Sequence, residues 1–154
     1  MKNISNRHAQ ISQTGNFTYL TRTQFTFYAS DSILNSVLGG IAGKRVSIAG
    51  YMQTKIGKTN LVRLVVGPQG AVSISDTATA RNVLKSLGVR LRMKKVLQVL
   101  GIVAGTPGII RSIYRSLYHK VTVYAIYLGE NSNIFVDTCN PSRTIQILKR
   151  NNLI

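Results

Sequence analysis

The sequence predicts an α+β protein of two ferredoxin-like βαββαβ units in tandem, with antiparallel sheets and the helices on one face. Two observations support this fold. The first half of the chain follows the order strand, helix, strand, strand, helix, strand. The second half repeats most of that order, and short segments recur at matching places. We therefore expect an N-terminal polar arm over residues 1–21, a first unit over 22–92 and a second unit over 93–154.

Local patterns place the elements of the first unit. Phe25 and Phe27 alternate with polar residues, which predicts a half-buried strand. Ser30 or Asp31 can cap the helix that follows, and Gly43 ends it. The remaining elements are strands at 46–51 and 60–66, a helix that Asp76 or Thr77 caps and Gly88 ends, and the start of a strand at 89–91.

The second unit repeats this order but lacks its last strand. We expect a strand at 94–103, a helix at 108–120, strands at 121–128 and 133–138, and a last helix with Pro141 at its first position. Few residues follow that helix. The closing strand must therefore be short, missing or supplied by another part of the assembly.

The repeat is visible in the residues themselves. Each aligned pair is short, but the pairs keep the same order and occupy the same places in the element pattern. The spacing is about 75 residues at first and falls to 64 by the second helix, which indicates shorter loops in the second unit. The matched segments are Ser30–Leu34 with Thr106–Ile110, Lys44–Ile48 with His119–Val123, Asn60–Leu61 with Asn133–Ile134, and Leu84–Lys85 with Leu148–Lys149.

Composition limits the chemistry. The 154 residues include 20 Lys and Arg but only 4 acids, a formal net charge of +16 that attracts polyanions or an acidic partner. The acids are Asp31, Asp76, Glu130 and Asp137, and no two are close in sequence. Paired-carboxylate catalysis and carboxylate metal sites would require the fold to gather nearly all of them. We expect no enzyme activity, no metal and no cofactor.

Cysteine usage and hydropathy give no sign of a secreted or membrane protein. Cys139 is the single cysteine, so it forms no internal disulfide, and we expect it to be a small core residue of a strand. The N-terminus is polar and has no apolar core of the signal-peptide type. The longest apolar stretch, 96–113, is interrupted by Gln98, a turn and Arg111, so it is a poor membrane span. We expect a cytoplasmic protein.

The turn Gly105-Thr106-Pro107-Gly108 is the strongest candidate site. An apolar strand precedes it, and a helical pattern with Ile109 at its start follows at once. Backbone N–H groups at such a helix entrance lack partners within the helix and can hold a small ligand. The same residues are also compatible with a tight structural turn, because two glycines flank a proline.

At this turn the sequence resembles the ACT-domain family of small regulatory modules. That family typically has Pro-Gly followed by two aliphatic residues here, and Pro107-Gly108-Ile109-Ile110 fits the pattern. The resemblance extends over about residues 22–150 as a whole. The first unit departs from it, because Asp31-Ser32 stands in place of Pro-Gly.

The resemblance implies a non-catalytic protein that binds an amino acid or similar small molecule and regulates a partner. In this family the ligand sits where two units meet, and sheets associate edge to edge, which implies that the two units form one extended sheet. The missing last strand leads us to expect that a homodimer completes this sheet. The residues implied for the ligand are Gly105, Thr106, Pro107, Gly108 and Ile109 together with Thr122, Val123 and Tyr124, and in the first unit Ser30, Asp31 and Ser32. Asp31 could pair with an ammonium group, although a helix cap is the simpler role.

A nucleic-acid-binding module is the alternative function. Arg90, Arg92 and Lys94 alternate along one predicted strand, which indicates a basic face. Ferredoxin-like RNA-binding sheets also need paired aromatic residues on their central strands, and the corresponding segments here offer only Phe135. Sequence-specific RNA recognition is therefore disfavoured, while attraction to polyanions through charge alone stays open.

Overall fold

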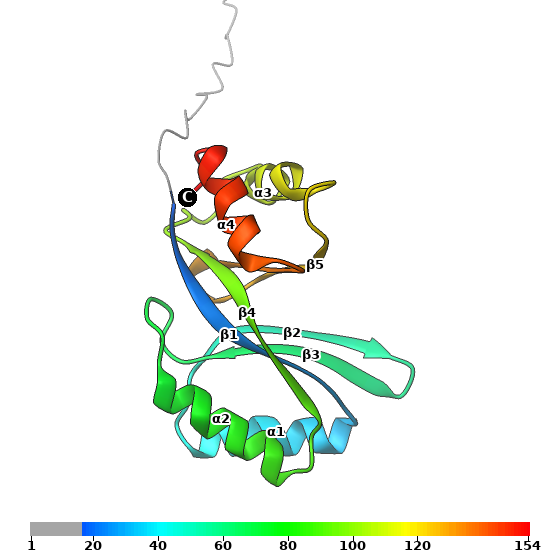
Figure 1. Cartoon of the computed structure of the whole chain (residues 1–154). Coiled ribbons are helices and arrows are strands. Elements are labelled where there is room, and N and C mark those ends of the chain that lie inside the picture. The colour runs from blue at the N-terminus through cyan, green and yellow to red at the C-terminus, as the bar shows by residue number, and fades with distance from the viewer. Residues whose placement is uncertain (1–16) are drawn as a thin grey trace, which may run out of the picture.

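The computed structural model describes residues 17–154, so residues 1–16 of the predicted arm lie outside the described residues. The six strands form one antiparallel sheet in the order β2-β3-β1-β4-β6-β5 (Figure 1). The elements are β1 (Thr18–Ala29), α1 (Asp31–Gly43), β2 (Ile48–Ile56), β3 (Thr59–Val66), α2 (Ile74–Ser86), β4 (Leu91–Leu100), α3 (Ile109–Leu117), β5 (Val123–Leu128), the 3-10 turn η1 (Glu130–Ser132), β6 (Ile134–Thr138) and α4 (Pro141–Arg150).

Strands β1 and β4 are long and run through both halves of the molecule (Figure 1). They pair with each other from Thr18 opposite Leu100 to Phe27 opposite Leu91. The C-terminal half of β1 also pairs with β3, which gives the first half the ferredoxin-like order β2-β3-β1-β4. The N-terminal half of β1 lies beside β4 where that strand pairs with β6. The chain itself thus supplies the strand that the second half lacked.

Two sequence predictions are wrong at these strands. The strands predicted at 89–91 and 94–103 are one strand, β4, so the boundary predicted between 92 and 93 falls inside an element. Strand β1 begins at Thr18, within the predicted arm. Both errors have the same cause, because polar and charged residues interrupt the apolar pattern of these strands. Arg90 and Arg92 are exposed, whereas Arg22 and Gln24 are buried against partners that are distant in the sequence. Ser73, not Asp76 or Thr77, caps α2.

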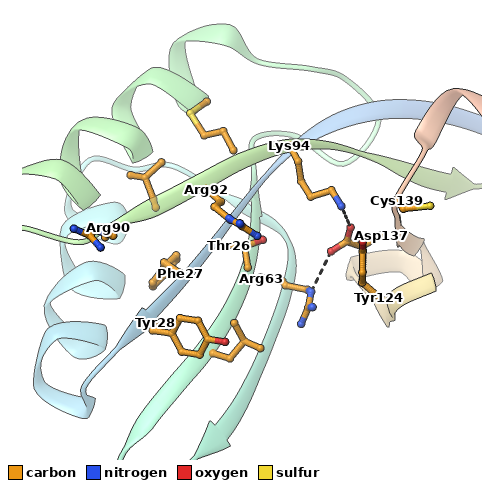
Figure 2. A pocket seen from close by; sticks show the side chains of 13 residues that line it. Thr26, Phe27, Tyr28, Arg63, Arg90, Arg92, Lys94, Tyr124, Asp137 and Cys139 are labelled. Carbon is orange, nitrogen blue, oxygen red and sulfur yellow. Dashed lines mark hydrogen bonds and ion pairs between the residues drawn. The ribbon is translucent and has the colours of Figure 1, made fainter. Parts of the chain in front are cut away.

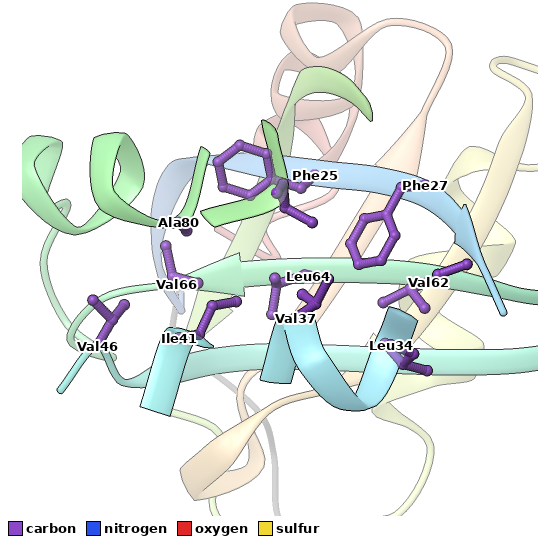
Figure 3. Packing of buried hydrophobic residues seen from close by; sticks show 12 residues of the cluster. Phe25, Phe27, Leu34, Val37, Ile41, Val46, Val62, Leu64, Val66 and Ala80 are labelled. Carbon is purple, nitrogen blue, oxygen red and sulfur yellow. The ribbon is translucent and has the colours of Figure 1, made fainter. Parts of the chain in front are cut away.

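All four helices cover the same face of the sheet, in two groups at opposite ends of β1 and β4 (Figure 1). Alternate side chains of β1 pack beneath α1 and α2, where Phe25, Phe27 and Leu64 meet Val37 and Ile41 (Figure 3). A second core beneath α3 and α4 contains Leu97, Val99, Ile113, Leu117 and Leu148. The apolar faces by which the sequence predicted these helices therefore pack against the sheet.

The other face of the sheet, here called the inner face, folds onto itself. Gly50 of β2 and Gly129 form an antiparallel bridge, although β2 and β5 are the two outermost strands. The rings of Tyr127 and Phe135 stack beneath this bridge, with centroids 5.2 Å apart. A Cβ added to Gly50 would lie 2.6 Å from the Phe135 ring, so only glycine allows this approach.

A buried polar network crosses the inner face. The Asp137 carboxylate accepts hydrogen bonds from Gln24 Nε2 at 2.9 Å and Arg63 Nε at 3.2 Å, and Lys94 Nζ lies 2.5 Å from it. The Tyr127 hydroxyl donates to Gln24 Oε1, and burial raises the pKa of Tyr127 above its ordinary value. Four strands therefore meet at one carboxylate: β1, β3, β4 and β6.

A second network holds the loop between β3 and α2. Arg22 is buried, and its guanidinium donates to the carbonyls of Val66 and Pro68 and to Gln98 Oε1 at 2.8–2.9 Å. Within residues 17–154 no carboxylate lies within 4.0 Å of this guanidinium, so neutral oxygens alone compensate the cation. Burial lowers the pKa of Arg22 from its ordinary value.

Gly50→Ala tests the contact between the two ends of the sheet. The added methyl group must displace the buried Phe135 ring, so we expect a loss of about 1–3 kcal/mol in the free energy of unfolding, measured with urea. Gly39→Ala is the control, because its Cβ meets open space on α1 and a helix gains up to about 1 kcal/mol from this change. Unchanged stability of Gly50→Ala would contradict the close packing.

Asp137→Asn tests the polar network. The amide keeps the size of the side chain but leaves Arg63 and Lys94 without a carboxylate, so we expect a loss of about 3 kcal/mol in stability at pH 7. Asp31→Asn is the matched control, because the Asp31–Lys55 pair is exposed and its loss should change stability little. Equal effects of the two substitutions would contradict a structural role for the network.

Candidate functional site

The four helices differ in how their N-termini are satisfied. Side-chain oxygens of Ser30, Ser73 and Asn140 accept hydrogen bonds from the first turns of α1, α2 and α4. Helix α3 instead begins after Gly108 with no side-chain cap, and its first intrahelical bond runs from Ser112 N to Gly108 O at 2.9 Å. The three N–H groups of residues 109–111 therefore precede the first bonded turn.

Glycine shapes the turn that leads into α3. Gly101, Gly105 and Gly108 have φ of +77°, +81° and +82°, a region that side chains with a Cβ rarely adopt. The Thr106 hydroxyl donates to Val103 O at 2.7 Å and the Thr106 N–H donates to the same oxygen at 3.1 Å. The Thr106 side chain thus stabilises the turn itself, while the N–H groups at the start of α3 stay open.

A cavity of about 440 Å³, here called the turn cavity, lies beside this turn. This volume is within the range of small-molecule sites. Its wall is largely aliphatic, and Arg111 adds a cation. The lining residues are 102–106 and 108–111 of the turn and α3 start, with Leu128, Ser132 and Ile134.

The turn cavity brings together part of the predicted site. Gly105, Thr106, Gly108 and Ile109 line it, and Pro107 lies in the same turn. The predicted partners Thr122, Val123 and Tyr124 are at the start of β5 and do not line it. Instead, β5 reaches the cavity through Leu128 at its other end.

The predicted residues of the first half have other roles. Ser30 caps α1 by accepting a hydrogen bond from Ile33 N, and its hydroxyl is 3.4 Å from that of Ser32. The Asp31 carboxylate contacts Lys55 Nζ at 2.6 Å and Asn60 Nδ2 at 2.7 Å. The hydrogen bond from Lys55 and then that from Asn60 hold the pKa of Asp31 below its ordinary value. This carboxylate is therefore already engaged within its own half.

A second cavity, of about 770 Å³, opens on the inner face and is here called the basic groove (Figure 2). The sequence indicates Arg90, Arg92 and Lys94 as a basic face but does not indicate that Arg63 of β3 and Asp137 of β6 join them. A charged residue within the apolar strand 60–66 was the available signal for Arg63. The lining residues are 26–28, Leu61, Arg63, 90–94, Tyr124, Asp137 and Cys139.

Neither a cluster of metal-ligating side chains nor a membrane-spanning helix is found among the described residues. Nowhere in residues 17–154 do three His, Cys, Asp or Glu side chains gather as metal ligands. No helix in the same range is long and apolar enough to cross a membrane.

The prediction of Cys139 as a core residue is wrong. Cys139 follows the last residue of β6 and is exposed, and its sulfur accepts a hydrogen bond from Thr122 N at 3.4 Å.

Comparisons with known proteins show the fold. No protein-family model and no curated protein sequence matches the chain. Among solved structures, protein BT0572 from Bacteroides thetaiotaomicron is similar, with a TM-score of 0.68, 16% identity, and 88% of this chain and 91% of that chain covered. The regulatory subunit of aspartate kinase from Thermus thermophilus has a TM-score of 0.57 and 13% identity, with 87% and 97% covered.

A larger enzyme contains the same fold as one part. Aspartate kinase from Synechocystis is similar with a TM-score of 0.62 and 16% identity, over 91% of this chain but only 27% of that chain. E. coli aspartokinase III, solved in complex with lysine and aspartate, has a TM-score of 0.51 and 16% identity, with 91% and 34% covered. At these identities the similarity shows a shared fold, the ACT-like ferredoxin fold with one antiparallel sheet and four helices.

Proposed function

We propose that this chain is a non-catalytic regulatory protein that binds a free amino acid, or a similar small carboxylate, in the turn cavity. The observation that carries the proposal is the start of α3, where N–H groups without a cap lie beside a cavity of about 440 Å³. Such groups and the helix dipole favour a carboxylate. The Arg111 side chain adds a positive charge, and the aliphatic wall can accept the ligand's side chain.

The shared fold supports a regulatory role. Regulatory subunits of aspartate kinase have this fold over nearly their whole length, and aspartokinase III with the same fold was solved with lysine and aspartate bound. We infer that the chain consists of two ACT-like units that share β1 and β4, since each half contains two helices on a four-stranded group. Turns 101–108 and 30–32 then occupy equivalent places, and only the former is uncapped.

The placement of the acids supports a role without catalysis. Asp31 is paired with Lys55, and Asp137 is held by Arg63, Lys94 and Gln24. Neither Asp76 nor Glu130 lines the turn cavity. Carboxylate-based acid–base chemistry needs such a group within reach of the substrate, so the placement of the acids suits this cavity to binding.

We further propose that a second copy of the chain closes the turn cavity. The closing strand that motivated a dimer comes from β1, so the reason for a dimer changes. Large apolar side chains are exposed at the cavity, including Val103 at 74%, Leu128 at 57% and Ile110 at 48%. Contact with another copy would remove this apolar surface from water. Light scattering with and without ligand tests this step.

A thermal-shift screen of the twenty amino acids tests the proposed function. A ligand that binds the folded state raises the melting temperature, and we expect this for one or a few amino acids at both 0.1 M and 0.5 M NaCl. The matching amino acid methyl ester should give no shift, because the carboxylate is the group held by the N–H groups. No response to any amino acid would contradict the proposal.

Gly108→Val tests the location of the site. A β-branched residue at φ +82° must move the backbone of the turn, so we expect the ligand-induced shift to disappear. Gly57→Val is the control, because Gly57 also has positive φ and open space at its Cβ but lies in the β2–β3 hairpin. Both variants should lose a similar amount of stability, and only Gly108→Val should lose the response. An unchanged response in Gly108→Val would remove the site from this turn.

A further inference from the structure

The basic groove lies away from the turn cavity and is built on strand register. Thr26 of β1 pairs with Arg63 of β3 on one side and Arg92 of β4 on the other. Directly paired residues project from the same face, so the two arginines flank Thr26 on the inner face, with Cα atoms about 10 Å apart. Arg90 and Lys94 are two residues either side of Arg92, at steps of about 7 Å along the chain.

The basic side chains of the groove outnumber its carboxylates. Asp137 is the only carboxylate among the lining residues, and its oxygens are already taken by Arg63 Nε and Lys94 Nζ. Only the Nε atom of Arg63 is used in this pair, which leaves its two terminal nitrogens for another acceptor (Figure 2). Within the described part of the chain, Arg90 and Arg92 have no carboxylate within 4.0 Å. These guanidinium groups are suited to bidentate contacts with phosphate.

Two exposed tyrosines lie beside the basic side chains of the groove. Tyr28 is 60% exposed and Tyr124 is 55% exposed, and both line the groove (Figure 2). Lys94 Nζ lies 4.8 Å from the centre of the Tyr124 ring, so the ammonium group already covers one face of that ring. The Tyr28 ring is two residues beyond Thr26 on the same face of β1, about 7 Å along the strand. An exposed ring at this distance can stack against a planar base.

We propose that the basic groove binds a nucleoside polyphosphate. Its phosphates lie between Arg63 and Arg92, and its base stacks on Tyr28. A volume of about 770 Å³ is in the range of small-molecule sites and is large enough for a mononucleotide. The proposal is independent of the amino-acid site, because the lining residues of the two cavities do not overlap.

Calorimetric titration of the full chain with ATP, in magnesium-free buffer with 0.1 M NaCl, tests the phosphate contacts. Arg92→Gln should weaken ATP binding about tenfold, since a charged hydrogen-bonding partner is lost. Lys95→Gln is the control, because it removes the same charge from the next residue, on the opposite face of β4, where Lys95 donates to Thr23. It should change the affinity less than about twofold. Absence of ATP binding, or equal losses in both variants, would overturn the proposal.

Tyr28→Ala tests the position of the base. It should weaken ATP binding about tenfold and leave the binding of inorganic triphosphate unchanged, because only ATP carries a base. Equal losses for both ligands would overturn the stacking. A ten-nucleotide single-stranded RNA is the last probe. Binding more than about a hundredfold tighter than ATP would overturn the mononucleotide and indicate a longer polyanion.

Discussion

The antiparallel pairing of β1 with β4 is the interaction on which the rest of the molecule depends. Ten residues of each strand pair without interruption, from Thr18 to Phe27. Helices α1 and α2 cover one end of this ribbon, and α3 and α4 cover the other (Figure 1). Neither half has four strands without the shared pair. The two halves therefore fold as one sheet whose outer strands meet again at Gly50 and Gly129.

Shared strands also explain why the inner face contains buried polar residues. The alternation that buries Phe25 and Leu97 under the helices turns Gln24 and Gln98 toward the opposite face. When the sheet folds onto itself, these polar groups are removed from water and need hydrogen-bond partners within the protein. For Gln24 these partners are Asp137 and Tyr127. The same strand then carries both candidate sites. Strand β4 begins at the basic groove and ends at the turn cavity, about 30 Å away along its length.

The sequence predicted what depends on local patterns and missed what depends on distant partners. Apolar spacing placed the four helices, the predicted caps were right only in part, and the turn at 105–108 was identified from Gly and Pro alone. The closing role of β1 could not be predicted, because residues 18–23 look like a polar lead-in until β4 covers one of their edges. Arg63 and Asp137 are 74 residues apart in the chain, so neither indicated a groove. The partners of the buried Arg22 could not be predicted either, because they lie 44–76 residues away in the chain.

The two proposed ligands bind at opposite ends of β4, and a nitrogen–proton correlation NMR titration distinguishes their sites most directly. The amino acid with the largest thermal shift is added first, and ATP is added to the same sample. We expect the amino acid to move the amide signals of residues 101–111, and ATP then to move those of residues 26–28, 63 and 90–94. Signals that move at the same residues for both ligands, or at neither group, would contradict this placement.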